Sequence, residues 1–472
     1  MNRTFKQSLL LVLAVTFFAA FSCFAQEQTA PKQTPPAGGP PKAFAVPAHE
    51  TYSLPNGMQV TIVPYGNLPK VTLSLVMRSG QSNQPADKLG IARLTGELLK
   101  EGTATRTAKQ IAEEAAQMGG AMEIGIGEDE SSLDTDVLSE SGPAAARLLA
   151  DVARHPLLPE SELSRLKTNA LRQVAIARTL PQQIAAERFR KILYPDHAYG
   201  RILPTAESIQ KLTIDDAKKF YADNIGAARA HLYVAGRFNT ATMKKAIAEG
   251  FGDWGRGQGP AVDVPKVKAQ RVLDVTDRPG AAQSTLFVGL PVADASSVDN
   301  IPLVVTNAIL GGSFGSRITS NIREQKGYTY SPNSQISRRY RDAYWVEVAD
   351  VTTAVTGPAL KEIFAEIERL QKEAPGAEEL AGIQRYLSGI FVIQNSSRQA
   401  LIGQLRFVDL QGLGDDYLKT YVQKVNAVTP ADVKRITAQY IKPEQMTIVV
   451  VGDKSKISEQ LTPFAVPVET NK

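Results

Sequence analysis

Glu97, in the stretch 90–103, is the residue best suited to metal chemistry, because its carboxylate offers oxygen lone pairs. One carboxylate does not make a metal site, and its neighbours do not complete one. Arg93 has no available lone pair, and Gly96 has no side chain that could act as a base. An ordinary helix with an Arg93–Glu97 ion pair, worth about a few tenths of a kcal/mol, also explains the spacing. The stretch alone therefore predicts a helix without chemistry of its own.

A second candidate is Ser313, because residues 311–315 match the letters of a Gly-x-Ser-x-Gly nucleophile elbow. That elbow needs a strand before it and a histidine after it in the chain. No histidine follows His231, and the four histidines are scattered, with none four residues from another. We interpret them as structural or surface residues. No Gly-Lys-Ser/Thr follows the glycines, so a phosphate-binding loop is not predicted either.

A short acidic run, Glu128 to Glu130, is the third candidate. Paired carboxylates can act as general acid and base, but nothing in the sequence places these three in a cleft. A solvated hairpin loop between two strands is the simpler interpretation.

The chain has 472 residues, which is too long for one core, so two or more domains are expected. Hydrophobic residues make up 43% and charged residues 21%, as in globular proteins. The net charge of +5 is mild, and no basic run with interleaved aromatic residues suggests nucleic-acid binding.

Residues 1–25 resemble a secretory signal peptide. Arg3 and Lys6 precede an apolar run, 9–21, that is too short to span a bilayer comfortably. We expect cleavage before Gln26, a periplasmic location and no membrane contact afterwards. A lipoprotein anchored at Cys23, the only cysteine, is the alternative, although the residues before it form a poor lipobox. Residues 26–47 are rich in proline and predict a tether.

Hydrophobic periodicity and turn residues predict alternating strands and helices after this tether. A capping box, Thr107 with Gln110, marks one helix start, and Gly119-Gly120 marks its end. The other predicted elements are strands at 52–63 (with a turn at 56–57), 71–77, 122–126, 131–138 and 231–236, and helices at 142–154, 160–178, 182–193 and 214–224.

An internal repeat is the strongest organisational signal. Residues 212–236 align without a gap with residues 428–452, at a constant offset of 216. Each copy predicts a capped helix, a short loop and an apolar strand that ends at glycine. The chain is therefore predicted to consist of two homologous α+β halves.

Three features together carry a resemblance to the pitrilysin/insulinase family of zinc peptidases. They are the repeat, the opening 54–60 and the frame of 90–103, which is Gly-x-Ala, five variable places, Leu, three further places and Gly-Thr. The resemblance implies two similar halves, each a mixed sheet backed by helices. In the family, four such halves, from one long chain or two short ones, close like a clam around a peptide. We expect an N-terminal half at 48–256, a linker at 257–268 and a C-terminal half at 269–465.

In that family an H-x-x-E-H motif fills the five variable places, where two histidines hold zinc and the glutamate polarises water. The matching positions here are Arg93, Gly96 and Glu97. The family's third ligand, a glutamate, would fall near residues 172–174, in a stretch without acidic residues. The resemblance therefore predicts a degenerate site with no metal in this chain.

The resemblance implies a role for Arg323 and Tyr330. They follow a Gly-Gly loop and a short helix in an Arg-Glu-x-x-Gly-x-x-Tyr pattern, seven residues apart. In the family such a pair holds the substrate carbonyl and helps to stabilise the tetrahedral intermediate. Preorganised donors of this kind are worth about 3–4 kcal/mol each. An exposed Arg323 without a role is the alternative.

We therefore predict a zinc-free subunit of a periplasmic heteromeric peptidase, inactive alone, paired with a homologous zinc-bearing subunit that cleaves peptides. The alternative is a non-catalytic peptide-binding or scaffold protein that forms a homodimer. Extended segments at 328–336 and 343–351 are candidates for binding a peptide by strand addition.

Overall fold

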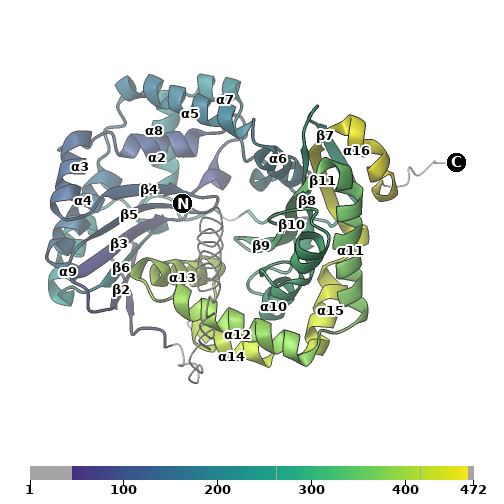
Figure 1. Ribbon diagram of the computed structural model, residues 1–472. Helices are drawn as coiled ribbons and strands as arrows, with labels where there is room; N and C mark the ends of the chain where they lie inside the picture. Colours follow the sequence, from purple (N-terminus) through teal and green to yellow (C-terminus); the bar gives the residue numbers. More distant parts are fainter. Residues whose placement is uncertain (1–44, 262, 415, 466–472) are drawn as a thin grey trace, which may run out of the picture. The chain divides into compact units, whose positions relative to one another are not determined.

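The computed structural model describes residues 45–261, 263–414 and 416–465 (Figure 1). The predicted signal peptide, and the predicted tether up to residue 44, lie outside these ranges. Within them no helix has the length and apolar character needed to cross a membrane.

A six-stranded mixed sheet forms the centre of the first half, in the order β1-β2-β6-β3-β5-β4. The β2–β6 pair is parallel and the other pairs are antiparallel. The strands are β1 (Glu50–Ser53), β2 (Gln59–Pro64), β3 (Lys70–Met77), β4 (Met122–Ile126), β5 (Ser131–Leu138) and β6 (Ala230–Gly236).

The second half repeats this topology with five strands, in the order β7-β11-β8-β10-β9. Here the β7–β11 pair is parallel and the others are antiparallel, so β7, β11, β8, β10 and β9 correspond to β2, β6, β3, β5 and β4. The strands are β7 (Val272–Asp277), β8 (Gln283–Val292), β9 (Asn333–Arg339), β10 (Asp342–Thr352) and β11 (Thr447–Gly452). The predicted fold class, α+β with two homologous halves, is confirmed.

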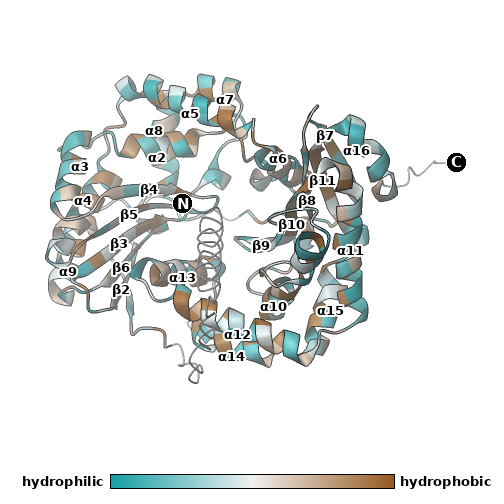
Figure 2. Ribbon diagram, in the orientation of Figure 1, coloured by the Kyte–Doolittle hydropathy of each residue, from teal (hydrophilic) through white to brown (hydrophobic). Residues whose placement is uncertain are grey.

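Helices cover both sheets. Those of the first half are α2 (Ile91–Leu99), α3 (Ala108–Gln117), α4 (Gly142–Arg154), α5 (Leu163–Ala177), α6 (Pro181–Leu193), α7 (Ala206–Lys211), α8 (Ile214–Asn224) and α9 (Thr240–Phe251). Those of the second are α10 (Asn300–Leu310), α11 (Thr356–Lys372), α12 (Ala377–Gln394), α13 (Arg398–Gln411), α14 (Asp416–Ala427), α15 (Pro430–Tyr440) and α16 (Lys454–Leu461). Figure 2 shows hydrophobic residues along β8 and β11 and hydrophilic residues over much of α16.

The duplicated segments fold alike. In α8 the side chain of Thr213 caps the backbone N–H of Asp216, and Thr429 caps Asp432 in the same way at the start of α15. Each helix leads to a fully buried strand, β6 or β11. Local capping chemistry thus sets the same helix start in both copies.

Each half lends one helix to the sheet of the other half. Helix α6 packs on β8 and β11 of the second sheet, whereas α13 packs on β3 and β6 of the first (Figure 1). Alternate residues of β11 serve different cores: Ile448 and Val450 face the second half's own helices, and Val449 and Val451 face α6. Central strands buried on both faces explain the continuous apolar runs in the sequence.

Two glycines make room for these exchanged helices. A Cβ on Gly289 of β8 would lie 3.0 Å from the ring of Phe189 in α6. A Cβ on Gly236 of β6 would lie 3.0 Å from the Cδ of Arg398 in α13, and Gly236 also has a φ of +139°. The same Cβ atoms would come closer still to the backbone oxygens of Trp345 and Lys70 on the neighbouring strands, so both strand pairing and helix packing require the missing side chain.

The chain between α9 and β7, as far as it is described, contains neither helix nor strand. The predicted linker at 257–268 lies in this segment, and the predicted limits of the two halves stay a proposal. Because α6 and α13 are exchanged, each half as delimited in the sequence includes one helix that packs on the sheet of the other half.

Candidate functional site

Helix α2 presents the three positions that correspond to the zinc motif. Its start is set by Gly90, whose φ of +100° suits glycine, and by Gln84, whose Oε1 accepts the backbone N–H of Gly90 at 2.8 Å. Glu97 pairs with Lys100, with 3.2 Å between Oε2 and Nζ. Arg93 makes no ion pair with any residue that the structure describes. The Arg93–Glu97 ion pair considered from the sequence is therefore absent.

The space beside Gly96 is filled. A Cβ at this position would lie 2.6 Å from Cδ1 and 3.0 Å from Cγ1 of Ile126, at the end of β4. A contact this short requires a neighbour to move. A carboxylate at position 96, which would act as the base of the family motif, would have to displace Ile126. Apolar packing therefore occupies the place of the lost base.

The predicted third position lies across a cavity from α2. Arg93 and Glu97 of α2 and Arg172 and Gln173 of α5 all line one cavity of about 710 Å³. The residues from 45 to 465 that the structure describes include no group of three or more His, Cys, Asp or Glu side chains that could hold a metal ion. The side chains present do not fit a zinc ion.

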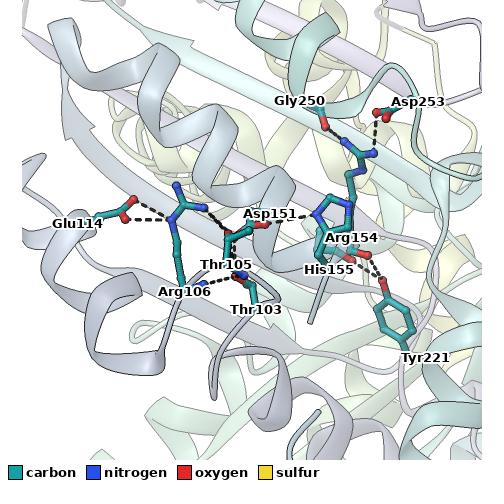
Figure 3. Close-up of polar contacts among 11 residues, drawn as sticks. Thr103, Thr105, Arg106, Glu114, Asp151, Arg154, His155, Tyr221, Gly250 and Asp253 are labelled. Carbon is teal, nitrogen blue, oxygen red and sulfur yellow. Dashed lines mark hydrogen bonds and ion pairs between the residues drawn. The ribbon is translucent and has the colours of Figure 1, made fainter. Parts of the chain in front are cut away.

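The end of the α2 frame is fixed by a polar cluster (Figure 3). Thr103 and Arg106 donate hydrogen bonds to the carboxylate of Asp151 in α4, at 2.6 and 2.8 Å, and His155 Nδ1 lies 3.3 Å from it. Arg106 also pairs with Glu114 of α3 at 2.9 Å. Burial by itself raises the pKa of Asp151, but these hydrogen bonds outweigh it and hold the pKa below its ordinary value.

A second cluster in Figure 3 ties α4 to α8 and α9. Arg154 binds the backbone carbonyl of Gly250 and, at 2.6 Å, the carboxylate of Asp253. The hydroxyl of Tyr221 donates to the carbonyl of Ala153 at 2.7 Å. Together the two clusters join the segment after α2 to α3 and α4, and α4 to α8 and α9.

Arg323 and Tyr330 are brought together by the structure. The guanidinium carbon of Arg323 lies 4.8 Å from the ring centroid of Tyr330 and 4.6 Å from that of Phe314. The Tyr330 and Phe314 side chains are 78% and 70% exposed. Arg323 Nε also lies 2.9 Å from Glu324 Oε1. Stacking on two rings favours one position of the cation, whose side chain is 24% exposed.

A π-helix, η6 (Thr319–Gln325), carries Arg323. Asn321 anchors it by donating to Glu362 and Glu366 of α11, at 3.0 and 2.8 Å. After the helix, Thr329 forms an isolated bridge to Val351 of β10. Single-turn π geometry is frequent at functional sites, and the sequence had indicated only a short helix here.

Of the two segments considered for strand addition, one is excluded. Residues 343–351 belong to β10, which pairs with β8 on one side and β9 on the other, so its backbone groups are already used. Strand β9 lies at the edge of the second sheet. Its outer edge is partly used within the protein, because Ser334 N–H donates to Gly311 O at 3.1 Å, Asn307 donates to Ser334 O at 3.3 Å and Gln411 donates to Arg339 O at 3.0 Å. Only the residues between these contacts remain candidates for adding a peptide strand.

The acidic run lies in the predicted hairpin loop between β4 and β5, but the prediction that this loop is solvated is wrong. Glu128 binds Arg190 of α6 and, at 2.5 Å, Arg339 of β9. Asp129 accepts hydrogen bonds from the Tyr199 hydroxyl at 2.6 Å and from the backbone N–H of Tyr340 at 2.9 Å. Burial raises the pKa of Glu130, against the opposing effect of Arg406 in α13. The run therefore joins the two halves.

This role has no local signal in the sequence, because every partner lies far along the chain. The remaining candidates have ordinary surroundings. The Ser313 hydroxyl donates to the carbonyl of Ala308 at 2.8 Å. His231 lies 2.8 Å from the Thr61 hydroxyl and 3.2 Å from Asp409. The hydrogen bonds given for Ser313 and His231 in the described part of the chain do not join the two residues.

Family models match both parts of the chain. The model described as insulinase (peptidase family M16) matches residues 62–206, and the model described as the peptidase M16 inactive domain matches residues 211–387. The chain belongs to the insulinase family.

Relatives within the insulinase family carry different names. The chain is 24% identical over 371 residues to an uncharacterized zinc protease, YmxG, of Bacillus subtilis, covering 76% of this chain and 90% of that one. It is 22% identical over 399 residues to a non-peptidase homolog, also named YmxG, of Helicobacter pylori, covering 82% and 90%.

Two solved structures show the insulinase-family fold. A peptidase M16 inactive domain from Pseudomonas fluorescens superposes with a TM-score of 0.79 at 24% identity, covering 86% of this chain and 98% of that one. The periplasmic protease PqqL from Escherichia coli gives a TM-score of 0.73 at 16% identity. This chain covers 49% of PqqL, so PqqL is about twice as long as the matched region.

Proposed function

We propose that this chain is the non-catalytic, zinc-free subunit of a heteromeric insulinase-like peptidase. Arg323 and Tyr330 bind the backbone carbonyl of a peptide, and a homologous partner with an intact H-x-x-E-H helix holds zinc and cleaves it. The observation that carries the proposal is the Arg323 guanidinium, held between two exposed rings. The same chain has no side-chain group for zinc among its described residues.

The exposure of the pair is an argument for a partner. Donors stabilise an oxyanion strongly only where water is excluded. With Tyr330 78% exposed, its hydroxyl competes with solvent in the isolated chain. A second chain that covers Arg323 and Tyr330 would remove this water and supply the reacting centre. The length of PqqL supports this arrangement, because two chains of the present size together match one chain of that length.

The composition of the native assembly tests the pairing. The protein is recovered from its native source by mild affinity purification, and zinc is counted by elemental analysis. We expect a stoichiometric second chain that carries H-x-x-E-H, with zinc in the pair and peptide hydrolysis only by the pair. A zinc-free homodimer without such a companion would overturn the proposal.

The role of Arg323 is tested in the assembled pair. Arg323→Ala should lower kcat by about 10²–10³-fold, as for other lost oxyanion donors, with zinc content unchanged. Tyr330→Phe removes only the hydroxyl and should act in the same direction. Arg385→Ala and Tyr386→Phe are matched controls, because both residues are exposed on α12. Unchanged turnover in Arg323→Ala would show that the residue does not act in catalysis.

The alternative is a peptide-binding or scaffold protein that acts as a homodimer without cleavage. The edge position of β9 favours it, since the part of that edge between Ser334 and Arg339 is a candidate for pairing with an extended peptide. A scaffold has no oxyanion to stabilise, so Arg323→Ala would then weaken peptide binding and leave no hydrolysis to measure.

We also propose a periplasmic location through the signal peptide at residues 1–25. The mature N-terminus decides between its two forms. Mass spectrometry should find Gln26 at the N-terminus in a periplasmic fraction, whereas a lipidated Cys23 would identify the lipoprotein alternative.

A further inference from the structure

The charged side chains that line the cavity between α2 and α5 are mainly basic. They are six cations and two carboxylates. The cations are Arg93, Arg165, Lys167, Arg172, Arg190 and Arg201, and the carboxylates are Glu97 and Glu128. Cations gathered in a cleft produce a positive potential that attracts anions. The strength of this attraction depends on how many of the six cations are already neutralised by protein carboxylates.

Part of the set is committed to protein partners. Arg165 pairs with Glu101 at 2.6 Å, and Arg190 pairs with Glu128. Lys167 donates to the backbone carbonyl of Leu212 at 2.9 Å. The cavity's other carboxylate, Glu97, is held by Lys100 outside the lining.

Three arginines remain without an acidic partner. Among the residues described, Arg93 and Arg201 form no ion pair, and Arg172 has only a 3.5 Å contact with the amide oxygen of Asn169. The Nε of Arg201 is buried and has no hydrogen-bond partner. A buried donor without an acceptor is costly, so an acceptor brought by a ligand would be favoured here.

The size and the remaining walls of the cavity restrict the ligand. A volume of about 710 Å³ is in the range of ligand pockets and far exceeds the need of an inorganic anion. Leu94, Ile202 and Leu203 supply apolar surface, and Asn169 and Gln173 supply amides that can pair with peptide groups. Carboxylates, apolar side chains and peptide groups occur together in an acidic peptide.

We infer that this cavity is a binding site for an acidic, partly apolar peptide segment, whose carboxylates are bound by Arg93, Arg172 and Arg201. It lies in the first half of the chain, away from the Arg323–Tyr330 pair of the second half in sequence. The site needs neither zinc nor a partner subunit. The inference therefore goes beyond the proposed function and can fail independently of it.

Binding to the isolated chain tests the inference. The probe is a labelled, blocked hexapeptide of alternating leucine and glutamate, followed by fluorescence anisotropy. The same peptide with glutamine in place of glutamate should bind about tenfold more weakly or worse, because each lost charge-assisted hydrogen bond weakens binding. Added salt should lower the affinity for the acidic peptide more than the affinity for the neutral peptide. Equal binding of both peptides, or of neither, would overturn the inference.

Variants of the cavity arginines test whether the acidic peptide binds in this cavity. The double substitution Arg93→Gln and Arg172→Gln should reduce affinity for the acidic peptide by about tenfold or more, whereas Arg385→Gln on α12 should not change it. Arg93 and Arg172 are exposed, so both variants should fold, which circular dichroism checks. Inorganic phosphate serves as a competitor. Phosphate binding without peptide binding would reduce the site to a small-anion site and overturn the peptide assignment.

Discussion

The carboxylate of Asp136 in β5 binds the guanidinium of Arg398 in α13, with 2.9 Å between Oδ1 and Nη2, across 262 positions of the chain. Lys70 of β3 also lies 2.8 Å from this carboxylate. The ion pair fixes the first turn of the exchanged helix to the first sheet, next to Gly236. A single carboxylate thus joins the two halves at the point where the helix arrives.

Loss of this carboxylate should weaken the whole fold. Asp136→Asn should lower the free energy of unfolding by about 1.5–3 kcal/mol, because it removes charge-assisted hydrogen bonds and leaves two cations without their partner. Denaturant unfolding measures this. Glu249→Gln is the control, since its ion pair with Arg147 is half exposed and should contribute at most about 1 kcal/mol. Equal losses of unfolding free energy in Asp136→Asn and Glu249→Gln would contradict the larger contribution assigned to Asp136.

The same group predicts a pH dependence. Burial alone raises the pKa of Asp136, but hydrogen bonds from Lys70, Thr72 and Arg398 outweigh it and bring the pKa below the ordinary value of 3.8. The stabilisation is therefore fully present above that value and is lost as the pH falls through the lower pKa of the folded state. The gap in stability between wild type and Asp136→Asn should be largest near neutral pH and close in acid. A gap that widens in acid would reverse the assigned sign.

Phe189 should be a point of high sensitivity. It is fully buried, and its ring lies 5.3 Å from Tyr344 and 6.1 Å from Phe287 between centroids. Phe189→Ala should cost about 3–5 kcal/mol, the usual loss for a large side chain in a tight core. Leu180→Ala, just before α6, is the control and should change stability by about 0.5 kcal/mol or less, because Leu180 is 47% exposed. A small effect at Phe189 would mean that α6 is not firmly packed on the second sheet.

The contact between Gly96 and Ile126 can be measured by a double-mutant cycle. Gly96→Ala gains about 0.5–1 kcal/mol of helix propensity but adds an overpacking cost of about 1–3 kcal/mol, so a net loss is expected. Ile126→Ala alone should destabilise by opening a cavity. In the double variant the two losses should partly cancel, since the new methyl group fills the space. Strict additivity would show that the two positions do not touch.

Asp151 provides an independent test in the first half. Asp151→Asn should destabilise the fold by about 1–3 kcal/mol, because Thr103 and Arg106 lose a charged acceptor. The lowered pKa of Asp151 again places this contribution above the ordinary pKa of 3.8, with loss in acid. Thermal unfolding over a pH series measures it. Asp223→Asn, on the exposed face of α8, should leave the curve nearly unchanged.

Local signals made much of the fold predictable. Strands 122–126 and 131–138 and helix 214–224 have the predicted bounds. Their signals are the alternation of apolar and polar residues, a capping box and turn residues, all of which involve residues close together in the sequence. The capping box at Thr107 and Gln110 is likewise present. Each of these features depends on residues within a few positions of one another.

The features that could not be predicted from the sequence depend on contacts between residues far apart in the chain. The exchange of α6 and α13 leaves no local trace, since both helices have ordinary amphipathic patterns. The pairing of Glu128 with Arg190 and Arg339 joins residues far apart in the chain. The family resemblance predicted that Arg323 and Tyr330 act together, and the structure stacks them, but it did not predict the third member, Phe314.

The exchange of α6 and α13 gives two equivalent helices different histories during synthesis. Helix α13 follows in the chain the complete sheet that receives it. Helix α6 precedes β11, the last strand of its sheet, so the ring of Phe189 lacks part of its covering sheet until that strand has been added. Burial of a helix of the first half is thus completed only by the C-terminal strand.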